Sequence, residues 1–166
     1  MKEIFERRSI RKYKNEKVSP QMAEKLLRAA MAAPTAGNQQ EWEFVIIEER
    51  GILDAITKIH PHSYMLKQAP LAIAVCADLN RETHKGYWPQ DCAAATQNIL
   101  LAAQHLGLGT CWLGIFPWKD RVKALKEILN LPENVMPLSI IAVGHPDEKK
   151  KALDRFDKNK VHINKW

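Results

Sequence analysis

Cysteine is scarce in this sequence, and its few cysteines are far apart. Cys76, Cys92 and Cys111 are the only three among 166 residues, and an odd number without close pairs is not typical of a disulfide framework. We therefore expect the chain to work in a reducing compartment. Because the charged N-terminal stretch also lacks the apolar core of a secretion signal, we expect a cytoplasmic protein.

Long apolar runs and stacked aromatics are missing as well. No apolar run reaches the roughly 20 residues that span a bilayer, so no membrane helix is predicted. The formal net charge is +6, but aromatic side chains are not interleaved with the basic ones as they are in nucleic-acid grooves. We therefore expect no membrane and no nucleic-acid partner. The basic residues indicate either a solvated surface or a site for a small anion.

The sequence has no repeat, no low-complexity tract and no long internal linker, so we expect one domain over residues 1–166. A chain of this length can bury about 70% of its unfolded surface without disulfides or metals. Apolar periodicity and turn residues locate the expected elements. We expect helices over 20–33, 51–59, 89–106 and 120–129, and strands over 44–47, 71–77, 110–115, 138–143 and, at a sheet edge, 161–166.

Two features of this pattern predict a homodimer. The helix over 89–106 is apolar on nearly every face, and a helix of that kind is normally buried on every face. In a small domain, a second subunit has to cover one of those faces. The final segment is separated from the last core strand by seventeen mostly polar residues, 144–160, and a linker of that length can cross to another chain.

The first candidate site is a basic cluster near the N-terminus. Arg7, Arg8 and Arg11 lie within five residues, and Ser9 supplies a hydroxyl. Arginine offers forked, permanently charged donors that match phosphate oxygens, and helical spacing would place Arg7 and Arg11 on one face. The cluster therefore predicts a phosphate site, with ordinary basic surface as the alternative.

The second candidate site is the stretch 33–42, which begins where a helix ends and stops where a strand begins. The proline, glycine and asparagine in it are typical of a tight loop. Thr35, Asn38 and Gln40 offer uncharged donors and acceptors, which suit the edge of a polar heterocycle. The alternative is a well-capped turn without a ligand.

The third candidate site follows the long helix. Gly107 and Gly109 are expected to end that helix as left-handed caps, and the buried strand that follows has a glycine, Gly114, at its end. A glycine at a strand end lets a backbone amide approach a ligand closely. The first two glycines are not a dinucleotide fingerprint, because they follow a helix and lack the six-residue spacing.

Taken in order, the three stretches resemble the nitroreductase family of FMN-dependent, NAD(P)H-oxidising oxidoreductases over nearly the whole chain. The family marks R-R-S-x-R and A-P-S-x-x-N-x-Q-P-W correspond to residues 7–11 and 33–42, and N-x-x-L-A-A-x-x-L-G-L-G corresponds to 98–109. Thr35 replaces the family's serine and keeps the hydroxyl. Glu41 replaces its proline, and we expect it to add a negative charge near the site that bears on the choice of acceptor.

The resemblance implies an α+β fold, with a mixed central β-sheet flanked by helices, in an intertwined homodimer that exchanges C-terminal segments. The active sites would lie at the dimer interface. One subunit's N-terminal cluster and the other subunit's loop would contact the same FMN, and a backbone N–H of the third stretch would point at the flavin N5. The residues implied to bind the cofactor are Arg7, Arg8, Ser9, Arg11, Pro34, Thr35, Ala36, Asn38, Gln40, Trp112, Leu113, Gly114, Lys151 and Arg155.

The implied activity is hydride transfer from NADH or NADPH through the flavin to a small oxidised acceptor, such as a nitroaromatic or a quinone, by a ping-pong mechanism. We assign no catalytic acid or base, because the cofactor carries the chemistry, and no metal ligand, because no metal-site spacing is evident. Two alternatives stay open: an FMN-binding or sensor protein without nicotinamide turnover, and a specialised flavin enzyme such as a reductive dehalogenase. The physiological acceptor and the preferred nicotinamide stay open as well.

Overall fold

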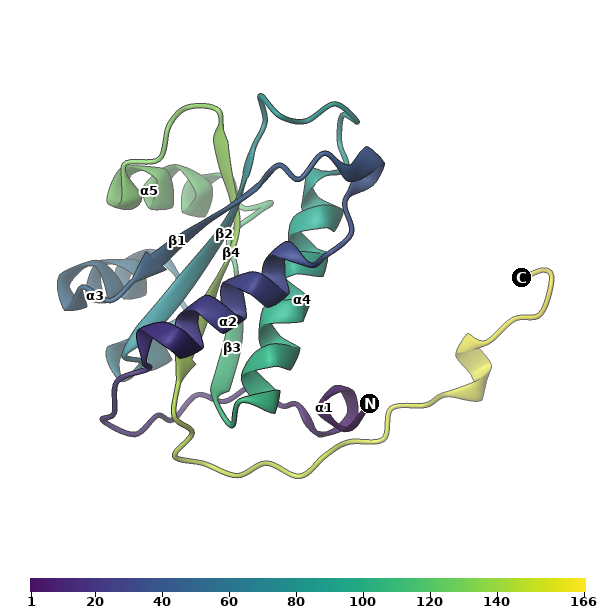
Figure 1. Ribbon diagram of the computed structural model, residues 1–166, viewed down its shortest axis with the longest axis horizontal. Coiled ribbons are helices and arrows are strands. Elements are labelled where there is room, and N and C mark those ends of the chain that lie inside the picture. The colour runs from purple at the N-terminus through teal and green to yellow at the C-terminus, as the bar shows by residue number, and fades with distance from the viewer.

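The computed structural model describes residues 1–166 as a four-stranded sheet with helices on both faces (Figure 1). The expected α+β class is confirmed. No helix in it combines the length and the apolar character needed to cross a membrane. The elements are α1 (Lys2–Glu6), α2 (Pro20–Met31), η1 (Ala36–Asn38), β1 (Trp42–Ile47), α3 (Arg50–Ile59), η2 (Tyr64–Lys67), β2 (Leu71–Asp78), α4 (Trp88–His105), β3 (Gly109–Gly114), α5 (Lys119–Leu129), β4 (Val135–Gly144) and η3 (Lys158–Lys160), the three η elements being short 3-10 helices.

The strands lie in the order β1-β2-β4-β3, and every neighbouring pair is antiparallel. Strand β3 is therefore at an edge of the sheet. The N-terminal segment runs beside it and forms one parallel bridge, between Ser9 and Thr110. Within one chain this bridge is the only parallel pairing, so the sheet that we expected to be mixed is antiparallel everywhere else.

Strand β2 lies in the middle of the molecule and is buried on both faces. Its odd-numbered residues, such as Ile73 and Val75, pack with α2 and α4, and its even-numbered residues, such as Ala74, pack with α3 and α5. Successive side chains of a strand point to opposite faces, which produces this division. The result is one apolar core on each face, and Figure 1 shows the pair α2 and α4 opposite the pair α3 and α5.

Local sequence signals set most helix ends as expected. Ser19 Oγ accepts a hydrogen bond of 3.2 Å from a backbone N–H of the first turn of α2, and Pro20 opens that turn. Gly107 follows α4 with a φ of 73°, in the left-handed region that glycine adopts readily. Gly109 instead begins β3, where an added Cβ would lie 2.8 Å from Ile10 Cγ2. It is required for close packing, so the expectation of a second left-handed cap is wrong.

The segment after α1 is extended rather than helical. Helix α1 ends at Glu6, and Arg7 has a φ of −56° and a ψ of 131°. The Ile10 N–H then donates to Thr110 O at 2.9 Å, and the Ile10 side chain is buried. Pairing with β3 therefore holds the segment straight. The expectation that Arg7 and Arg11 share a helix face is wrong for this reason.

The expected edge strand over 161–166 does not form within the chain. After β4 the chain leaves the body of the molecule and extends away from it, as the yellow segment of Figure 1 shows. A strand needs the N–H and C=O groups of a neighbour, and no other segment of the same chain lies beside this one. The large apolar side chains of the tail are left uncovered: Phe156 is 79%, Ile163 83% and Trp166 101% exposed.

Candidate functional site

A cavity of about 270 Å³ lies where the N-terminal segment meets the chain after β4. Five of its six lining side chains are basic and none is acidic. Because these cations repel one another, a bound anion would relieve their repulsion. We call it the cationic cavity, and its lining residues are Arg7, Arg8, Ser9, Arg11, Lys150 and Arg155.

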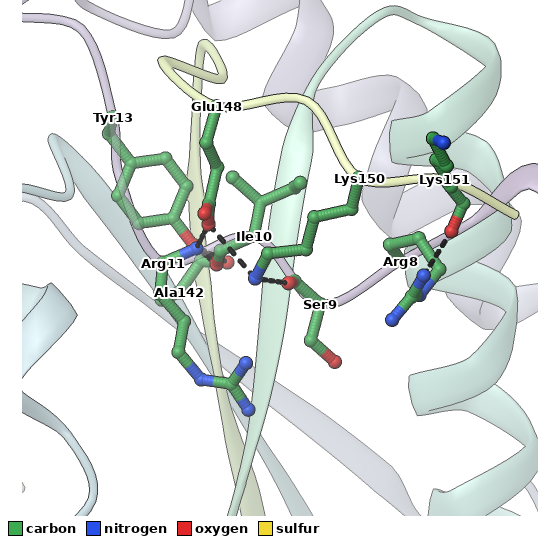
Figure 2. Close-up of polar contacts among 9 residues, drawn as sticks. All are labelled: Arg8, Ser9, Ile10, Arg11, Tyr13, Ala142, Glu148, Lys150 and Lys151. Carbon is green, nitrogen blue, oxygen red and sulfur yellow. Dashed lines mark hydrogen bonds and ion pairs between the residues drawn. The ribbon is translucent and has the colours of Figure 1, made fainter.

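Two segments far apart in the sequence hold the cationic cavity together (Figure 2). Lys150 Nζ donates to Ser9 O at 2.7 Å and pairs with Glu148 Oε1 at 3.1 Å. The Arg11 N–H donates to the same Glu148 oxygen at 2.5 Å. Burial would raise the pKa of Glu148, but these hydrogen bonds from Arg11 and Lys150 outweigh it and lower the pKa. Glu148 is therefore ionised, and it neutralises Lys150.

The arginines of the cationic cavity have no such counter-ion. No carboxylate pairs with Arg7, Arg11 or Arg155. The pKa of Arg7 is lowered, first by burial and then by repulsion from Arg155 and Arg8. Arginine stays charged even so, and the local positive potential is available to a ligand.

The structure brings together five of the six residues predicted near the phosphate, and the sixth, Lys151, is replaced by its neighbour Lys150. Lys150 lines the cationic cavity, whereas the Lys151 side chain is exposed. Lys151 takes part only through its backbone carbonyl, which accepts a hydrogen bond from Arg8. Three consecutive lysines in a segment without helix or strand periodicity give no sequence signal for which one faces inward.

The second predicted stretch forms a polar loop, residues 34–41, between α2 and β1. Gly37, Asn38 and Gln40 have φ values of 55°, 56° and 48°, in the left-handed region that glutamine rarely adopts. Thr35 Oγ1 accepts from the Gln40 N–H at 3.1 Å, and Asn38 Oδ1 accepts from Gln40 Nε2 at 2.8 Å. The loop's own polar groups therefore fix its shape. Pro34, Asn38 and Gln40 are exposed, and Thr35 and Ala36 are half-buried.

The polar loop and the cationic cavity lie at opposite ends of α4. The Ala36 N–H donates at 3.0 Å to Asp91 Oδ2, in the first turn of α4. Arg8 lies beside Gln104, in its last turn. Asp91 and Gln104 are thirteen residues apart in α4, which is about 20 Å at 1.5 Å per residue, and Figure 1 shows the two regions at opposite ends of this helix. The first and second predicted stretches therefore do not meet within one chain.

The third predicted stretch lies on the edge strand β3. Leu113 is buried and Trp112 is 37% exposed, while a Cβ added at Gly114 would meet nothing within 4 Å. Gly114 is four residues along the strand from Thr110, which pairs with the N-terminal segment. That distance is about 13 Å. Strand β3 thus leads from the cationic cavity to an open position beside Gly114.

Two side chains from other elements hold the Gly114 carbonyl. Arg121 Nη1 donates to it at 3.1 Å, and His60 Nε2 lies 3.1 Å from it. Because His60 Nδ1 accepts from the His62 N–H at 3.2 Å, we assign the ring proton to Nε2, which donates to Gly114. Burial, and then the charge of Arg121, lowers the pKa of His60, so the ring is neutral near pH 7.

Glu41, which we expected to add a negative charge near the site, is 0% exposed. Burial raises its pKa, and neighbouring Asp91 raises it further. A carboxyl group in such a place is favoured in its neutral form. Sequence reasoning missed the cluster of Gln39, Glu41 and Asp91, although an aspartate in the first turns of an otherwise apolar helix was a usable signal.

Fold and site together define an α+β domain with a cationic cavity at one end of an edge strand and a rigid polar loop at the far end of its longest helix. Comparison with known proteins identifies the family. The profile of the Nitroreductase family matches residues 4–62 and 59–145, and this chain belongs to that family.

Individual relatives agree with this assignment. The chain is 44% identical over 163 residues to a protein of Methanothermobacter thermautotrophicus provisionally named NADH dehydrogenase/NAD(P)H nitroreductase, which covers 98% of this chain and 85% of that protein. A provisionally named NADH oxidase of Clostridium acetobutylicum has a crystal structure that matches with a TM-score of 0.95 and 48% identity, over 99% of each chain. An FMN-dependent nitroreductase of Clostridium difficile matches with a TM-score of 0.91 and 33% identity, over 99% of this chain and 98% of that one.

Proposed function

We propose that this chain is an FMN-dependent oxidoreductase that takes hydride from NADH or NADPH and passes it to a small oxidised acceptor. The observation that carries the proposal is the cationic cavity. Five basic side chains and one hydroxyl, without an acidic lining residue, suit the phosphate ester of FMN, since guanidinium forks match phosphate oxygens. The C. difficile relative, which is named FMN-dependent, supports this choice of cofactor.

The rest of the site fits a flat ring attached to that phosphate. Strand β3 runs from the cationic cavity to Gly114, where space beside the backbone is open. Because Arg121 and His60 hold the Gly114 carbonyl, this main chain is a rigid surface for the ring. We assign phosphate contacts to Arg7, Arg8, Ser9, Arg11, Lys150 and Arg155, a supporting carbonyl to Lys151, and ring contacts to Trp112, Leu113 and Gly114.

A second copy of the chain completes the site in this proposal. One flavin contacts both the cationic cavity and the polar loop only when the loop comes from the partner, because about 20 Å of α4 separates them within one chain. The uncovered tail supplies a segment of residues 156–166 that can wrap the partner. The residues that reach the partner's flavin would then be Pro34, Thr35, Ala36, Asn38 and Gln40.

When bound, FMN supplies reversible two-electron chemistry, so that one site can oxidise a nicotinamide and then reduce an acceptor in a ping-pong sequence. The chain itself supplies binding, orientation and charge. Its arginines hold the phosphate end, the β3 backbone orients the ring, and Arg121 behind Gly114 adds positive potential that favours negative charge at the ring. The nicotinamide and the acceptor each need to approach the reacting atom of the flavin ring to roughly 3–3.5 Å. No side chain is assigned as an acid or base.

The test is anaerobic mixing of the purified protein with NADH and with NADPH, followed by a panel of nitroaromatic, quinone and halogenated acceptors. We expect yellow protein whose flavin absorbance bleaches with at least one nicotinamide and returns with at least one acceptor. Colourless protein that does not take up FMN would overturn the proposal. Flavin that stays oxidised with both nicotinamides would indicate a sensor, and recovery only with a halogenated acceptor would indicate a reductive dehalogenase.

A further inference from the structure

The polar loop is anchored by a buried carboxyl pair, Glu41 and Asp91. Glu41 is 0% and Asp91 6% exposed. One amide group, Gln39 Nε2, donates to both, at 2.9 Å to Glu41 Oε1 and at 2.9 Å to Asp91 Oδ2. Asp91 Oδ2 also accepts from the Ala36 N–H at 3.0 Å. The carboxyl pair therefore ties both ends of the loop to the first turns of α4.

One atom of this network has no partner among the hydrogen bonds described. Glu41 Oε2 is buried and unsatisfied, and burying an unpaired carboxylate oxygen is strongly unfavourable. Two ionised carboxylates around a single amide would also repel each other. Both problems disappear when a proton on Glu41 Oε2 is donated to Asp91, which leaves the carboxyl pair with one proton and one negative charge.

We propose that Glu41 and Asp91 share one proton, and that this proton fixes the polar loop in the shape that meets the flavin. The role toward flavin rests on the proposed function, whereas the shared proton rests on the geometry of the pair. Loss of the proton would place two negative charges in a dry space, and hydration of one of them would pull residues 39–41 away from α4. Glu41 and Asp91 are thus positioning residues.

Gln39 extends the effect to a neighbouring loop. Its Oε1 accepts from the His84 N–H at 2.9 Å, while its Nε2 is occupied by the carboxyl pair. A change in the carboxyl pair therefore reaches the segment before α4 through one side chain. The His84 ring packs over Gly37, where an added Cβ would lie 2.1 Å from His84 Cε1.

The surroundings offer the carboxyl pair no cation. Cys92 of α4 faces this region, burial raises the pKa of its thiol, and its Sγ donates to the Cys76 carbonyl of β2 at 3.3 Å. Asp78 at the end of β2 pairs with Arg81 at 3.5 Å, so that cation is already engaged. No ion pair includes either member of the carboxyl pair. A proton is the positive charge that remains.

This arrangement sets the direction of the pH dependence. The pKa of Glu41 is raised in the fold from 4.5 by burial and then by Asp91. The stabilisation by the proton is therefore complete below the ordinary pKa and is lost as the pH rises through the raised value. We expect loss of the proton to weaken FMN binding by at least about fivefold, the lower end of typical coupling between sites.

Glu41→Gln is the decisive variant, because its amide reproduces the neutral acid. The new NH₂ group donates to Asp91 as the proton does, its oxygen still accepts from Gln39, and it does not titrate. Because ionisation of the FMN phosphate affects both forms alike, we expect the ratio of the wild-type FMN dissociation constant to that of Glu41→Gln to rise from about pH 5 to about pH 9. Glu43→Gln, a partly exposed position on the same strand, should keep the wild-type profile. An equal pH dependence in Glu41→Gln and wild type would overturn the positioning role.

Infrared spectroscopy tests the proton without flavin. The wild type at pH 6 should show a protonated-carboxyl C=O stretch that Glu41→Gln lacks and Glu43→Gln keeps. Asp91→Asn is the second variant, and it should lose the band too, because its amide donates to Glu41 and favours the ionised carboxylate. Absence of the band from the wild type would overturn the shared proton. Failure of every form to bind FMN would refute the proposed function and the role toward flavin, and the band would still decide the proton.

Discussion

The two ends of α4 handle charge in opposite ways. At its last turn the cationic cavity gathers five basic side chains, and at its first turn the carboxyl pair places two acids together without a cation. Arginines do not lose their protons at physiological pH, so the first end needs an anion from outside. A carboxyl group can take up a proton, so the second end is neutralised from within. The contrast shows that this fold leaves charge without a counter-ion where a ligand is expected. Where the charged groups only support a loop, a proton can neutralise them.

The largest expected effect comes from removing the C-terminal segment that is proposed to wrap the partner chain. Deleting residues 156–166 removes four exposed apolar side chains, each worth about 1.5–3 kcal/mol when fully buried against a partner. We expect the dimer to weaken by at least about 3 kcal/mol and to lose FMN with it. Sedimentation velocity over a dilution series measures this, with Lys160→Ala in the exposed tail as the control. An intact dimer in the deletion variant would contradict the exchange of C-terminal segments.

The cationic end is tested by Arg11→Ala. Loss of a charged hydrogen bond to phosphate should weaken FMN binding by about 1.5–3 kcal/mol. The neighbouring exposed residue Lys12 supplies the control, since Lys12→Ala changes the net charge equally without touching the cavity. Fluorescence titration with FMN measures both variants. Equal affinities for them would remove Arg11 from the site.

The packing of the N-terminal segment against β3, between the cationic cavity and Gly114, is tested by Gly109→Ala. The added Cβ would lie 2.8 Å from Ile10 Cγ2 and 2.9 Å from Ile10 Cβ, so the N-terminal segment has to move off β3. We expect a loss of about 1–2 kcal/mol in the free energy of unfolding, as for other overpacked sites. Gly114→Ala has open space and should leave that free energy unchanged. Urea unfolding measures the free energy of unfolding of both variants. Equal values for Gly109→Ala and Gly114→Ala would show that the N-terminal segment moves off β3 without cost.

The smallest expected effect is a pH dependence of the free energy of unfolding that arises from His60, with a sign opposite to the pH dependence expected from Glu41. The pKa of His60 is lowered by burial and by Arg121. Its contribution to stability is therefore complete above the ordinary value of about 6.5 and is lost as the pH falls through the lowered pKa. His60→Gln should flatten the decline in unfolding free energy between roughly pH 7 and pH 5 by less than about 1 kcal/mol. His162→Gln in the exposed tail is the control, and an unchanged slope in His60→Gln would show that another group titrates.

The sequence predicted those parts of the fold that depend on local signals. The start of α2 at Pro20, the buried run of β2 and the apolar pattern of α4 each depend on residues close together in the sequence, and each appears in the structure. The extended path of Arg7–Arg11 depends on pairing with Thr110, about a hundred residues away, so helical spacing was misleading there. Residues 161–166 have the alternating pattern of a strand, but no neighbouring strand of the same chain pairs with them, and the pattern alone is not enough to form a strand.

The same distinction applies to the candidate site. Residue types suited to phosphate identified the arginines of the cationic cavity, but only the folded path after β4 shows that Lys150 faces inward. Glu41 was read as a charge because sequence gives no measure of burial. Its depth and its neighbour Asp91, fifty residues away, determine its protonation instead.

The length of α4 has a consequence for how such a protein matures. On the proposed function, a lone polypeptide carries one half of each of two sites and a whole copy of neither. Cofactor and partner are then acquired in one event, and flavin retained on the protein becomes a reporter of pairing. The fraction of flavin that sediments with the protein and the molecular mass would decline together on dilution, over the same concentration range.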